Sequence, residues 1–276
     1  NRLQPGILPI FSWIFKNKLP TNEIPDVVIS CGRKSVYLSI FLKKKYKDII
    51  NIHIQNPKIS FKNFDYIVAP YHDNIKGKNV LESIGALHQF NKNIYNESHD
   101  KDFLILKKKL VSIIIGGDNN HYTFDLKEVN KLILIIKELK KNNSQFNFLI
   151  LYSRRTNNKM KNLIEEKLKN SLYIQDKNEK NPYIFALKNS ESFIVTSDST
   201  SMISECAFTG KPIYIFHLPF KRKSKRIEKF HHQFEELNIT KNLNNEKKIS
   251  KWTYNSLDES KRIASILKKR IIKEKS

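Results

Sequence analysis

The stretch that decides the fold is 192–216, which reads SFIVTSDSTSMISECAFTGKPIYIF. It opens with an apolar, β-branched run over Ser192–Thr196, typical of a parallel strand buried on both faces. A cluster of hydroxyl side chains then begins a helix expected over Thr200–Phe208. Gly210 ends that helix, and the next strand is expected over Pro212–Phe216. A strand, a helix and a strand in so short a stretch predict a βαβ unit.

The same alternation of short apolar runs and amphipathic stretches extends toward both ends of the chain. Further strands are expected at Asp26–Ser30, Ile49–Ile54, Asp65–Ala69, Val111–Ile115, Phe146–Tyr152 and Ser171–Ile174. Further helices are expected at Ser35–Lys45, Leu126–Lys140, Met160–Lys169, Ile227–Leu237 and Asp258–Lys273. The predicted fold class is therefore α/β, with parallel sheets covered by helices.

A polar stretch, Asn91–Asp102, interrupts this alternation before a fresh strand begins at Val111. The interruption predicts two Rossmann-like domains: an N-terminal domain over 1–105 and a ligand-binding domain over 106–255. The remaining residues, 256–276, predict a helix that packs back on the body through an apolar face containing Ile263 and Ile266.

Composition excludes several classes of protein. The chain has 276 residues, of which 39% are hydrophobic and 28% charged, so a disordered or collagen-like chain is excluded. Two cysteines without a CxxC pattern offer no disulfide framework or zinc site, which favours a cytoplasmic location. The opening Asn1–Lys18 lacks the pattern of a signal peptide, and no apolar run reaches the length of a membrane span.

The formal net charge of +23 suggests an anionic partner. Only 8 of the 50 basic residues are arginine, the side chain that favours base readout, and no nucleic-acid-binding motif accompanies the charge. Nucleic acid is therefore the least favoured partner. An anionic substrate, or peripheral contact with an anionic membrane such as an inner membrane, is favoured.

The hydroxyl cluster at the start of the helix is the first candidate ligand site. Backbone N–H groups at a helix N-terminus bind phosphate, and hydroxyls at Ser197, Ser199, Thr200 and Ser201 would add donors. Glu205, one turn further, would accept hydrogen bonds from ribose hydroxyls. The alternative is an ordinary helix cap, for which Asp198 or Ser199 would suffice.

Two more polar segments follow predicted strands. One holds Gly116, Gly117 and Asn119, where the backbone could approach a ligand; the other holds Ser153, Arg154 and Arg155, where the arginines could bind an anion. The alternative for the arginines is a solvated basic loop. Because the carboxyl ends of parallel strands meet at one edge, all three segments are predicted to converge on one ligand.

His72 and Asp73 follow the predicted strand Asp65–Ala69 and could act as a general base and its orienting group. The alternative is a turn with a surface histidine. His231 and His232 lie on a predicted helix without a metal-ligand spacing and are interpreted as structural.

Taken in order, these motifs resemble one family. They are Ser-Cys-Gly-Arg-Lys at 30–34, Pro-Tyr-His-Asp at 70–73, Asn-Val at 79–80, Gly-Ala-Leu-His at 85–88, Ile-Gly-Gly at 115–117, Ser-Arg-Arg-Thr at 153–156, Pro-Tyr at 182–183, and the hydroxyl segment at 195–205. The chain resembles bacterial members of the mitochondrial fission "elongated mitochondria" family, which carry a loose label of nucleoside-diphosphate-sugar epimerase.

The resemblance implies a GT-B-like fold in which two Rossmann-like domains face across a cleft. It implies that the N-terminal domain lies on the acceptor side and that the second domain binds the nucleotide sugar. It implies a metal-independent glycosyltransferase that uses a nucleotide-diphosphate sugar as substrate, an unidentified acceptor and no cofactor. Two alternatives stay open: a non-catalytic, membrane-associated adaptor that recruits a partner, and a GT-B-type sugar-nucleotide epimerase. The family's usual opening Gly-x-x-Gly-x-x-x-Gln is missing, so the N-terminal domain is expected to lack its first βα unit.

Overall fold

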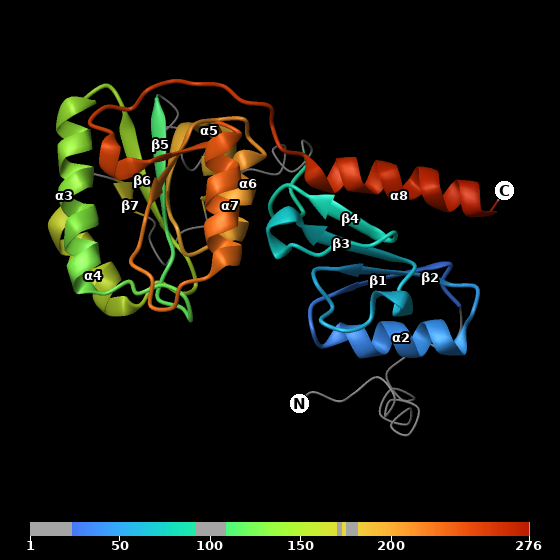
Figure 1. The fold of residues 1–276 in the computed structure, drawn as a ribbon. Helices are drawn as coiled ribbons and strands as arrows, with labels where there is room; N and C mark the ends of the chain where they lie inside the picture. The colour runs from blue at the N-terminus through green and yellow to red at the C-terminus, as the bar shows by residue number, and fades with distance from the viewer. Residues whose placement is uncertain (1–23, 92–108, 170–172, 175–181, 276) are drawn as a thin grey trace. The chain divides into compact units, whose positions relative to one another are not determined.

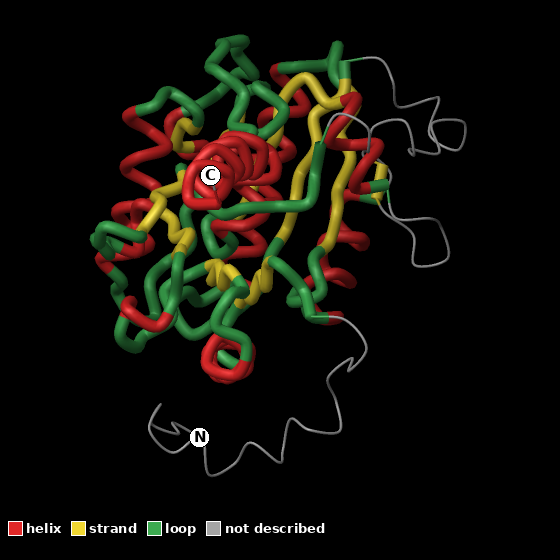
Figure 2. Tube along the Cα trace, turned by 90° about the vertical axis from the view of Figure 1, so that its right-hand side faces the viewer, coloured by secondary structure: helices red, strands yellow, loops and turns green. Residues whose placement is uncertain are grey.

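A computed structural model describes residues 24–91, 109–169, 173–174 and 182–275 (Figures 1 and 2). These residues form two compact units. The first unit comprises the described chain up to Ile84 together with Lys261 and the residues after it, and the second unit is Gly85–Ser260. The division falls at Ile84, whereas the sequence places a boundary after residue 105, next to residues that are not described.

The first unit contains one parallel four-stranded sheet in the order β1-β2-β3-β4. Its strands are Val27–Cys31 (β1), Ile50–Ile54 (β2), Tyr66–Pro70 (β3) and Val80–Ser83 (β4). Helix α2 (Ser35–Lys45) packs Val36 and Ile40 against Ile67 and Ala69, and this cluster forms the core. Strand β4 was not predicted, because its four residues include the exposed Glu82 and form no continuous apolar run.

The second unit contains a parallel six-stranded sheet in the order β10-β9-β8-β5-β6-β7. The strands are Leu110–Ile115 (β5), Asn147–Tyr152 (β6), Tyr173–Ile174 (β7), Ser190–Thr196 (β8), Ile213–Phe216 (β9) and Thr240–Asn242 (β10). Every residue of β5 is buried, as a strand covered on both faces requires. Residues 171–172 of the predicted strand Ser171–Ile174 lie outside the described residues.

Helices cover both faces of this second sheet, and helix follows strand along the trace (Figures 1 and 2). Helices α3 (Leu126–Asn142) and α4 (Asn158–Leu168) lie on one face, and α6 (Thr200–Ala207) and α7 (Lys225–Glu236) lie on the other (Figure 1). Asp125 caps α3 by accepting from the Glu128 N–H at 3.0 Å. The α/β class with two Rossmann-like units is therefore confirmed.

Two further elements of the second unit were missed. Helix α5 (Tyr183–Asn189) has only seven residues, too few to establish a helical period after Pro182. Strand β10 consists of a threonine, a lysine and an asparagine at the edge of the sheet, and it lacks the apolar run by which strands were identified.

The last helix, α8 (Glu259–Lys275), contributes Lys261 and the residues after it to the first unit. Arg262 Nη2 donates to the Glu82 carbonyl at 2.7 Å, and Ile263 is buried. No helix in the described ranges combines the length and the apolar character needed to cross a bilayer. The predicted loss of a first βα unit concerns residues 1–23, which lie outside the described residues, and stays a prediction.

Candidate functional site

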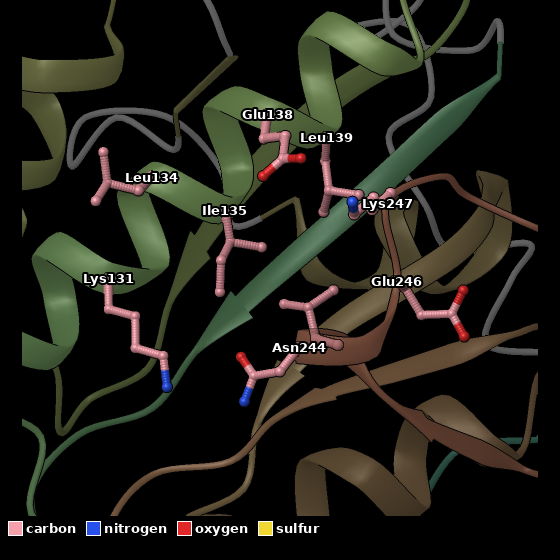
Figure 3. A pocket seen from close by; sticks show the side chains of 9 residues that line it. Lys131, Leu134, Ile135, Glu138, Leu139, Asn244, Glu246 and Lys247 are labelled. Carbon is pink, nitrogen blue, oxygen red and sulfur yellow. The ribbon is translucent and has the colours of Figure 1, made fainter.

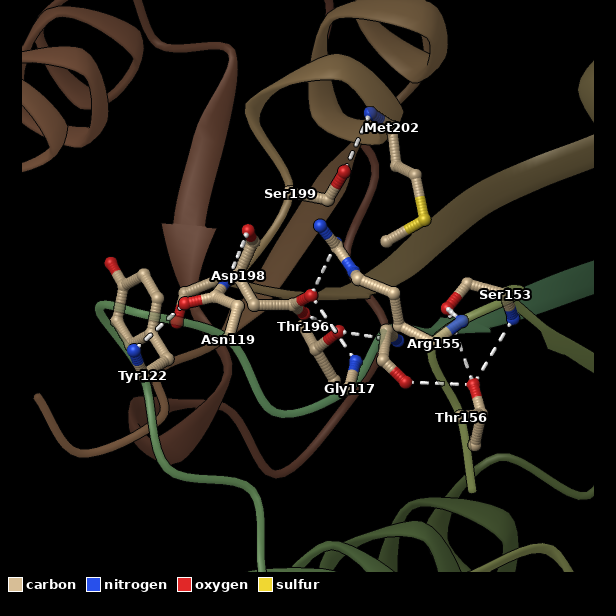
Figure 4. A network of polar contacts seen from close by, with 12 residues as sticks. Gly117, Asn119, Tyr122, Ser153, Arg155, Thr156, Thr196, Asp198, Ser199 and Met202 are labelled. Carbon is tan, nitrogen blue, oxygen red and sulfur yellow. Dashed lines mark hydrogen bonds and ion pairs between the residues drawn. The ribbon is translucent and has the colours of Figure 1, made fainter. Parts of the chain in front are cut away.

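The three polar segments of the second unit meet at one edge of its sheet, as the sequence predicts (Figure 4). Asp198, just beyond β8, accepts through Oδ2 from the Gly117 N–H at 3.2 Å and from Arg155 Nη2 at 2.6 Å. Gly117 follows β5 and Arg155 follows β6, so one carboxylate connects the ends of three neighbouring strands.

Asp198 is a fully buried charge with several donors. Its side chain has no accessible surface, and Thr196 Oγ1 donates to Oδ1 at 2.6 Å. Burial raises the pKa of Asp198, and the bonds from Thr196, Arg155 and Gly117 act in the opposite direction. From the sequence, Asp198 is predicted only as a possible helix cap, although it lies directly after a buried strand and between two serines.

The Gly116–Gly117 pair is required by how closely the chain packs against itself. A Cβ on Gly116 would lie 2.0 Å from Asp198 Oδ1, and a Cβ on Gly117 would lie 2.1 Å from the Arg155 carbonyl oxygen. The Gly116 N–H donates to Thr196 Oγ1 at 2.8 Å. Both glycine N–H groups are thus used inside the chain, and a ligand role for these glycines stays a prediction.

The start of α6 presents free hydroxyl groups. Ser199 caps the helix, with Oγ accepting from the Met202 N–H at 3.5 Å. Within the described chain, the hydroxyls of Thr200 and Ser201 have no hydrogen-bond partner, and Ser201 is exposed. Ser197 differs, because it is buried and its Oγ accepts from the Leu218 N–H at 3.0 Å. The hydroxyls with some exposure are therefore those of Ser199, Thr200 and Ser201, and that of Ser199 already accepts the capping bond.

The two arginines have different surroundings. Arg155 is committed to Asp198, whereas Arg154 is exposed and its guanidinium has no hydrogen bond or ion pair to any described residue. Ser153 holds the turn in shape: its N–H donates to the Ile115 carbonyl at 2.9 Å, and its Oγ accepts from the Arg155 N–H at 3.2 Å. Arg154 is the guanidinium available to an anion.

Glu205 lies one turn beyond Ser201 on the same face of α6, because residues four apart stack along a helix. The Tyr183 hydroxyl donates to its Oε2. Burial raises the pKa of Glu205 and, further, that of Tyr183. The carboxylate therefore has a fixed orientation and retains lone pairs for another donor.

Two loops frame this edge. Asn119 Nδ2 donates to the Asp198 carbonyl at 3.1 Å, and Asn119 Oδ1 accepts from the Tyr122 N–H at 2.9 Å (Figure 4). On α6, Ser204 Oγ accepts from the Ala86 N–H at 2.9 Å. Gly85 has φ +71°, and a Cβ there would lie 2.5 Å from Ser204 Oγ. The Gly-Ala-Leu-His segment is therefore packed along α6.

His72 and Asp73 lie in the first unit, in the single turn of 3-10 helix η3 (Tyr71–Asp73) after β3. His72 is 3% exposed, so the alternative interpretation, a turn with a surface histidine, is wrong about the exposure of this side chain. Both residues have contacts within the described chain, and their role as general base and orienting group stays a prediction.

A cavity of about 500 Å³ in the second unit lies elsewhere, between α3 and the chain after Leu243 (Figure 3). Its lining includes Leu134, Ile135, Asn244 and Glu246, and none of the predicted site residues. Within the described ranges, no group of three or more His, Cys, Asp or Glu side chains is arranged to hold a metal ion.

Sequence comparison gives a family match over most of the chain. Residues 6–271 match the model of the family described as "Mitochondrial fission ELM1". The chain is 31% identical to the uncharacterized protein RP120 of Rickettsia prowazekii, over 91% of this chain and 80% of that protein. It is 25% identical to the mitochondrial fission protein ELM1 of Arabidopsis thaliana, over 90% of this chain and 64% of that protein.

Solved structures share the fold. A UDP-GlcNAc 2-epimerase from Methanocaldococcus jannaschii aligns with a TM-score of 0.53 and 16% identity, over 96% of this chain and 81% of its own. The S. aureus MnaA–UDP co-structure aligns with a TM-score of 0.50 and 13% identity, over 89% and 71%. At these identities the likeness concerns the fold, and it agrees with the GT-B-like class that the motifs imply.

Proposed function

The chain belongs to the mitochondrial fission ELM1 family, and we propose that its second unit binds a nucleotide-diphosphate sugar as the donor substrate of a GT-B-like glycosyltransferase. Two features of the same sheet edge carry the proposal. The hydroxyls of Thr200 and Ser201 at the start of α6, and the guanidinium of Arg154 after β6, have no partner among the described residues.

The diphosphate binds at the start of α6. The helix dipole and the hydroxyls of Thr200 and Ser201 favour negative charge there, and Arg154 adds a guanidinium suited to phosphate. When the sugar leaves, negative charge develops on the β-phosphate, and fixed donors of this kind stabilise it electrostatically. Arg155 contributes indirectly, because it balances the buried charge of Asp198.

The ribose binds at Glu205. The five helical steps from Thr200 to Glu205 span about 7.5 Å along the helix axis at 1.5 Å per residue. A nucleoside diphosphate laid along the Ser201–Glu205 face would thus place its phosphates at the start of the helix and its ribose hydroxyls near the carboxylate. The Tyr183 hydroxyl fixes the orientation of that carboxylate.

The fold neighbours support this ligand class, since one of them is a UDP co-structure. They also keep a GT-B-type epimerase as an alternative reaction of the same site.

The acceptor's general base is proposed to be His72, with Asp73 orienting it. Incubation with a UDP-sugar distinguishes the reactions, because an epimerase changes the sugar without an acceptor and a transferase requires one.

Calorimetric titration of UDP into the full chain tests the site, and titration of uridine, which lacks the diphosphate, is the comparison. Arg154→Gln is expected to weaken UDP binding about tenfold, as expected for loss of a charge-assisted phosphate contact, without changing the melting temperature. Arg270→Gln, an exposed arginine of α8, is the matched control and is expected to bind UDP like the parent. Equal UDP affinity in the parent and Arg154→Gln would refute the assignment.

A second candidate function, a non-catalytic adaptor at a membrane surface, is favoured by α8. Its last turns carry Lys268, Lys269, Arg270 and Lys273, and Ile272 is 58% exposed beside them. A basic helix with an exposed apolar residue suits an anionic lipid surface. Flotation with phosphatidylglycerol vesicles tests this candidate: Ile272→Ser with Lys269→Gln should abolish binding, and unchanged flotation would exclude it.

A further inference from the structure

The strongest concentration of positive charge in the second unit follows β9. Residues 221–226, Lys-Arg-Lys-Ser-Lys-Arg, contain five cationic side chains, and all five are exposed. We call these residues the cationic run. They lead into α7, whose first turn begins with Lys225 and Arg226 and whose preceding Ser224 makes no side-chain cap.

Backbone contacts fix the cationic run against the loop that follows β5. The N–H groups of Lys221 and Arg222 both donate to the His121 carbonyl, at 2.8 and 3.2 Å. The rings of Tyr122 and Phe220 are stacked with centroids 4.6 Å apart. The run is therefore held in place at its base and does not extend freely into solvent.

The same loop contacts the candidate nucleotide site. Asn119, two residues before His121, donates to the Asp198 carbonyl at 3.1 Å. Strand β9 is also the direct neighbour of β8, at the end of which α6 begins. Adjacent strands lie about 5 Å apart, so the base of the run and the phosphate-binding start of α6 share one edge of the sheet.

Only part of the charge of the run is balanced: Arg226 has a contact within the chain, and Glu228 lies in the first turn of α7. Lys221 Nζ lies 3.5 Å from Asp118 Oδ2. In the part of the chain that the structure describes, the side chains of Arg222, Lys223 and Lys225 have no hydrogen-bond or ion-pair partner. Cations in the first turn of a helix are also opposed by its dipole. The repulsion among these cations and the helix dipole both destabilise the run, and a bound anion would relieve both effects.

We propose that the cationic run binds the phosphate ester of a second ligand, the acceptor of the transfer, beside the nucleotide. This inference rests on the proposed function. The shared chemistry is a phosphate monoester or diester, which a soluble metabolite and a lipid headgroup both supply. The acceptor is thereby assigned to the class of anionic, phosphorylated molecules.

The experiment compares three full-length proteins at one ionic strength. They are the parent, the run variant Arg222→Gln/Lys223→Gln/Lys225→Gln, and a control of equal charge, Lys127→Gln/Lys137→Gln/Lys248→Gln, which removes exposed lysines of the same unit outside the run. Each protein is titrated with glycerol 3-phosphate, with phosphatidylglycerol vesicles in phosphatidylcholine, and separately with UDP.

The run variant is expected to bind at least one phosphate probe about tenfold more weakly than the parent, while the control changes less than twofold. Loss of glycerol 3-phosphate binding indicates a soluble acceptor, and loss confined to vesicles indicates a lipid. Equal losses in variant and control, or a parent that binds neither probe, would overturn the proposal. If the parent does not bind UDP but binds a phosphate probe through the run, the proposed function is refuted and phosphate binding by the run is not.

Discussion

Arg155 Nη2 donates to Asp198 Oδ2 over 2.6 Å, joining a half-exposed guanidinium to a carboxylate without accessible surface. Its neighbour Arg154 has no such partner among the described residues. One arginine of the pair therefore stabilises the architecture of the site, and the other is free for a ligand. The first predictions follow from this division.

Arg155→Gln is expected to destabilise the second unit in a pH-dependent way. Burial already raises the pKa of Asp198 in the folded state, and removal of Arg155 raises it further. The folded pKa, already above the unfolded one, rises further in the variant. The stability of the variant is therefore retained below the ordinary aspartate pKa and falls more than that of the parent as the pH rises through the folded value. The loss at neutral pH should be about 1–3 kcal/mol, measured by chemical denaturation across pH.

The double variant Arg155→Gln/Asp198→Asn is the control for that measurement. It removes the buried charge together with its partner, so its free energy of unfolding at neutral pH should be higher than that of Arg155→Gln. Its stability should not depend on the ionisation of residue 198. A pH profile of Arg155→Gln parallel to that of the parent would contradict the role assigned to Asp198.

Gly116→Ala tests the close packing around Asp198. The new Cβ would lie 2.0 Å from Asp198 Oδ1, so the carboxylate must move and its bonds from Thr196 and Gly117 must break. A loss of roughly 2–4 kcal/mol is expected. Gly32→Ala is the comparison, because Gly32 has φ +78° and no atom within 4 Å of its Cβ position, and it should lose only about 1 kcal/mol. Similar melting temperatures for the two variants would contradict this account.

Glu205 should determine the preference for ribose. The parent is expected to bind UDP more tightly than 2′-deoxy-UDP, and Glu205→Gln should reduce that difference by about 1 kcal/mol through loss of a charge-assisted hydrogen bond. Tyr183→Phe should lower affinity for both ligands, because it releases the carboxylate from its fixed orientation. If Glu205→Gln discriminates between the two ligands as well as the parent does, the ribose lies elsewhere.

The first unit should lose stability in acid because of His53. This side chain is fully buried, its Nδ1 lies 2.8 Å from Ser30 Oγ, and burial lowers its pKa from 6.5 to about 4. A folded pKa below the unfolded one means that stability present above pH 6.5 is lost as the pH falls toward 4, by up to about 3 kcal/mol. Hydrogen exchange of the β2 amides measures this decline.

His53→Gln should make the stability of the first unit less dependent on pH. His232→Gln, at an exposed position of α7, should leave the pH dependence as it is in the parent. An unchanged pH slope in His53→Gln would show that another group is responsible.

Much of the fold could be predicted because its strands are buried on both faces. The run from Leu110 to Ile115 is recognisable as a strand because its side chains are nearly all apolar, and the apolar parts of β6, β8 and β9 give the same signal. Edge strands lack this signal: β10 is Thr-Lys-Asn, and β4 includes an exposed glutamate. Helix α5 is too short for a hydrophobic period to appear.

The candidate site was predictable in its location and less so in its internal bonding. Parallel strands ending in polar segments must place those segments at one edge, which is why Gly117, Arg155 and Asp198 meet. Which donors are used internally depends on contacts between residues some 40 to 80 positions apart in sequence, as in the Arg155 and Gly117 bonds to Asp198. No local pattern encodes such contacts, so the separate roles of Arg154 and Arg155 became apparent only in three dimensions.

The most direct test of the central claim is a thermal-shift panel of UDP, GDP, ADP and CDP with their common sugar conjugates on the full chain. Binding to the folded state alone raises stability by RT ln(1 + [L]/Kd). The account predicts saturable stabilisation by one nucleoside diphosphate, and a smaller stabilisation of Arg154→Gln at the same ligand concentration, as a tenfold higher Kd requires. A flat panel on folded protein, or stabilisation that Arg154→Gln leaves unchanged, would contradict it.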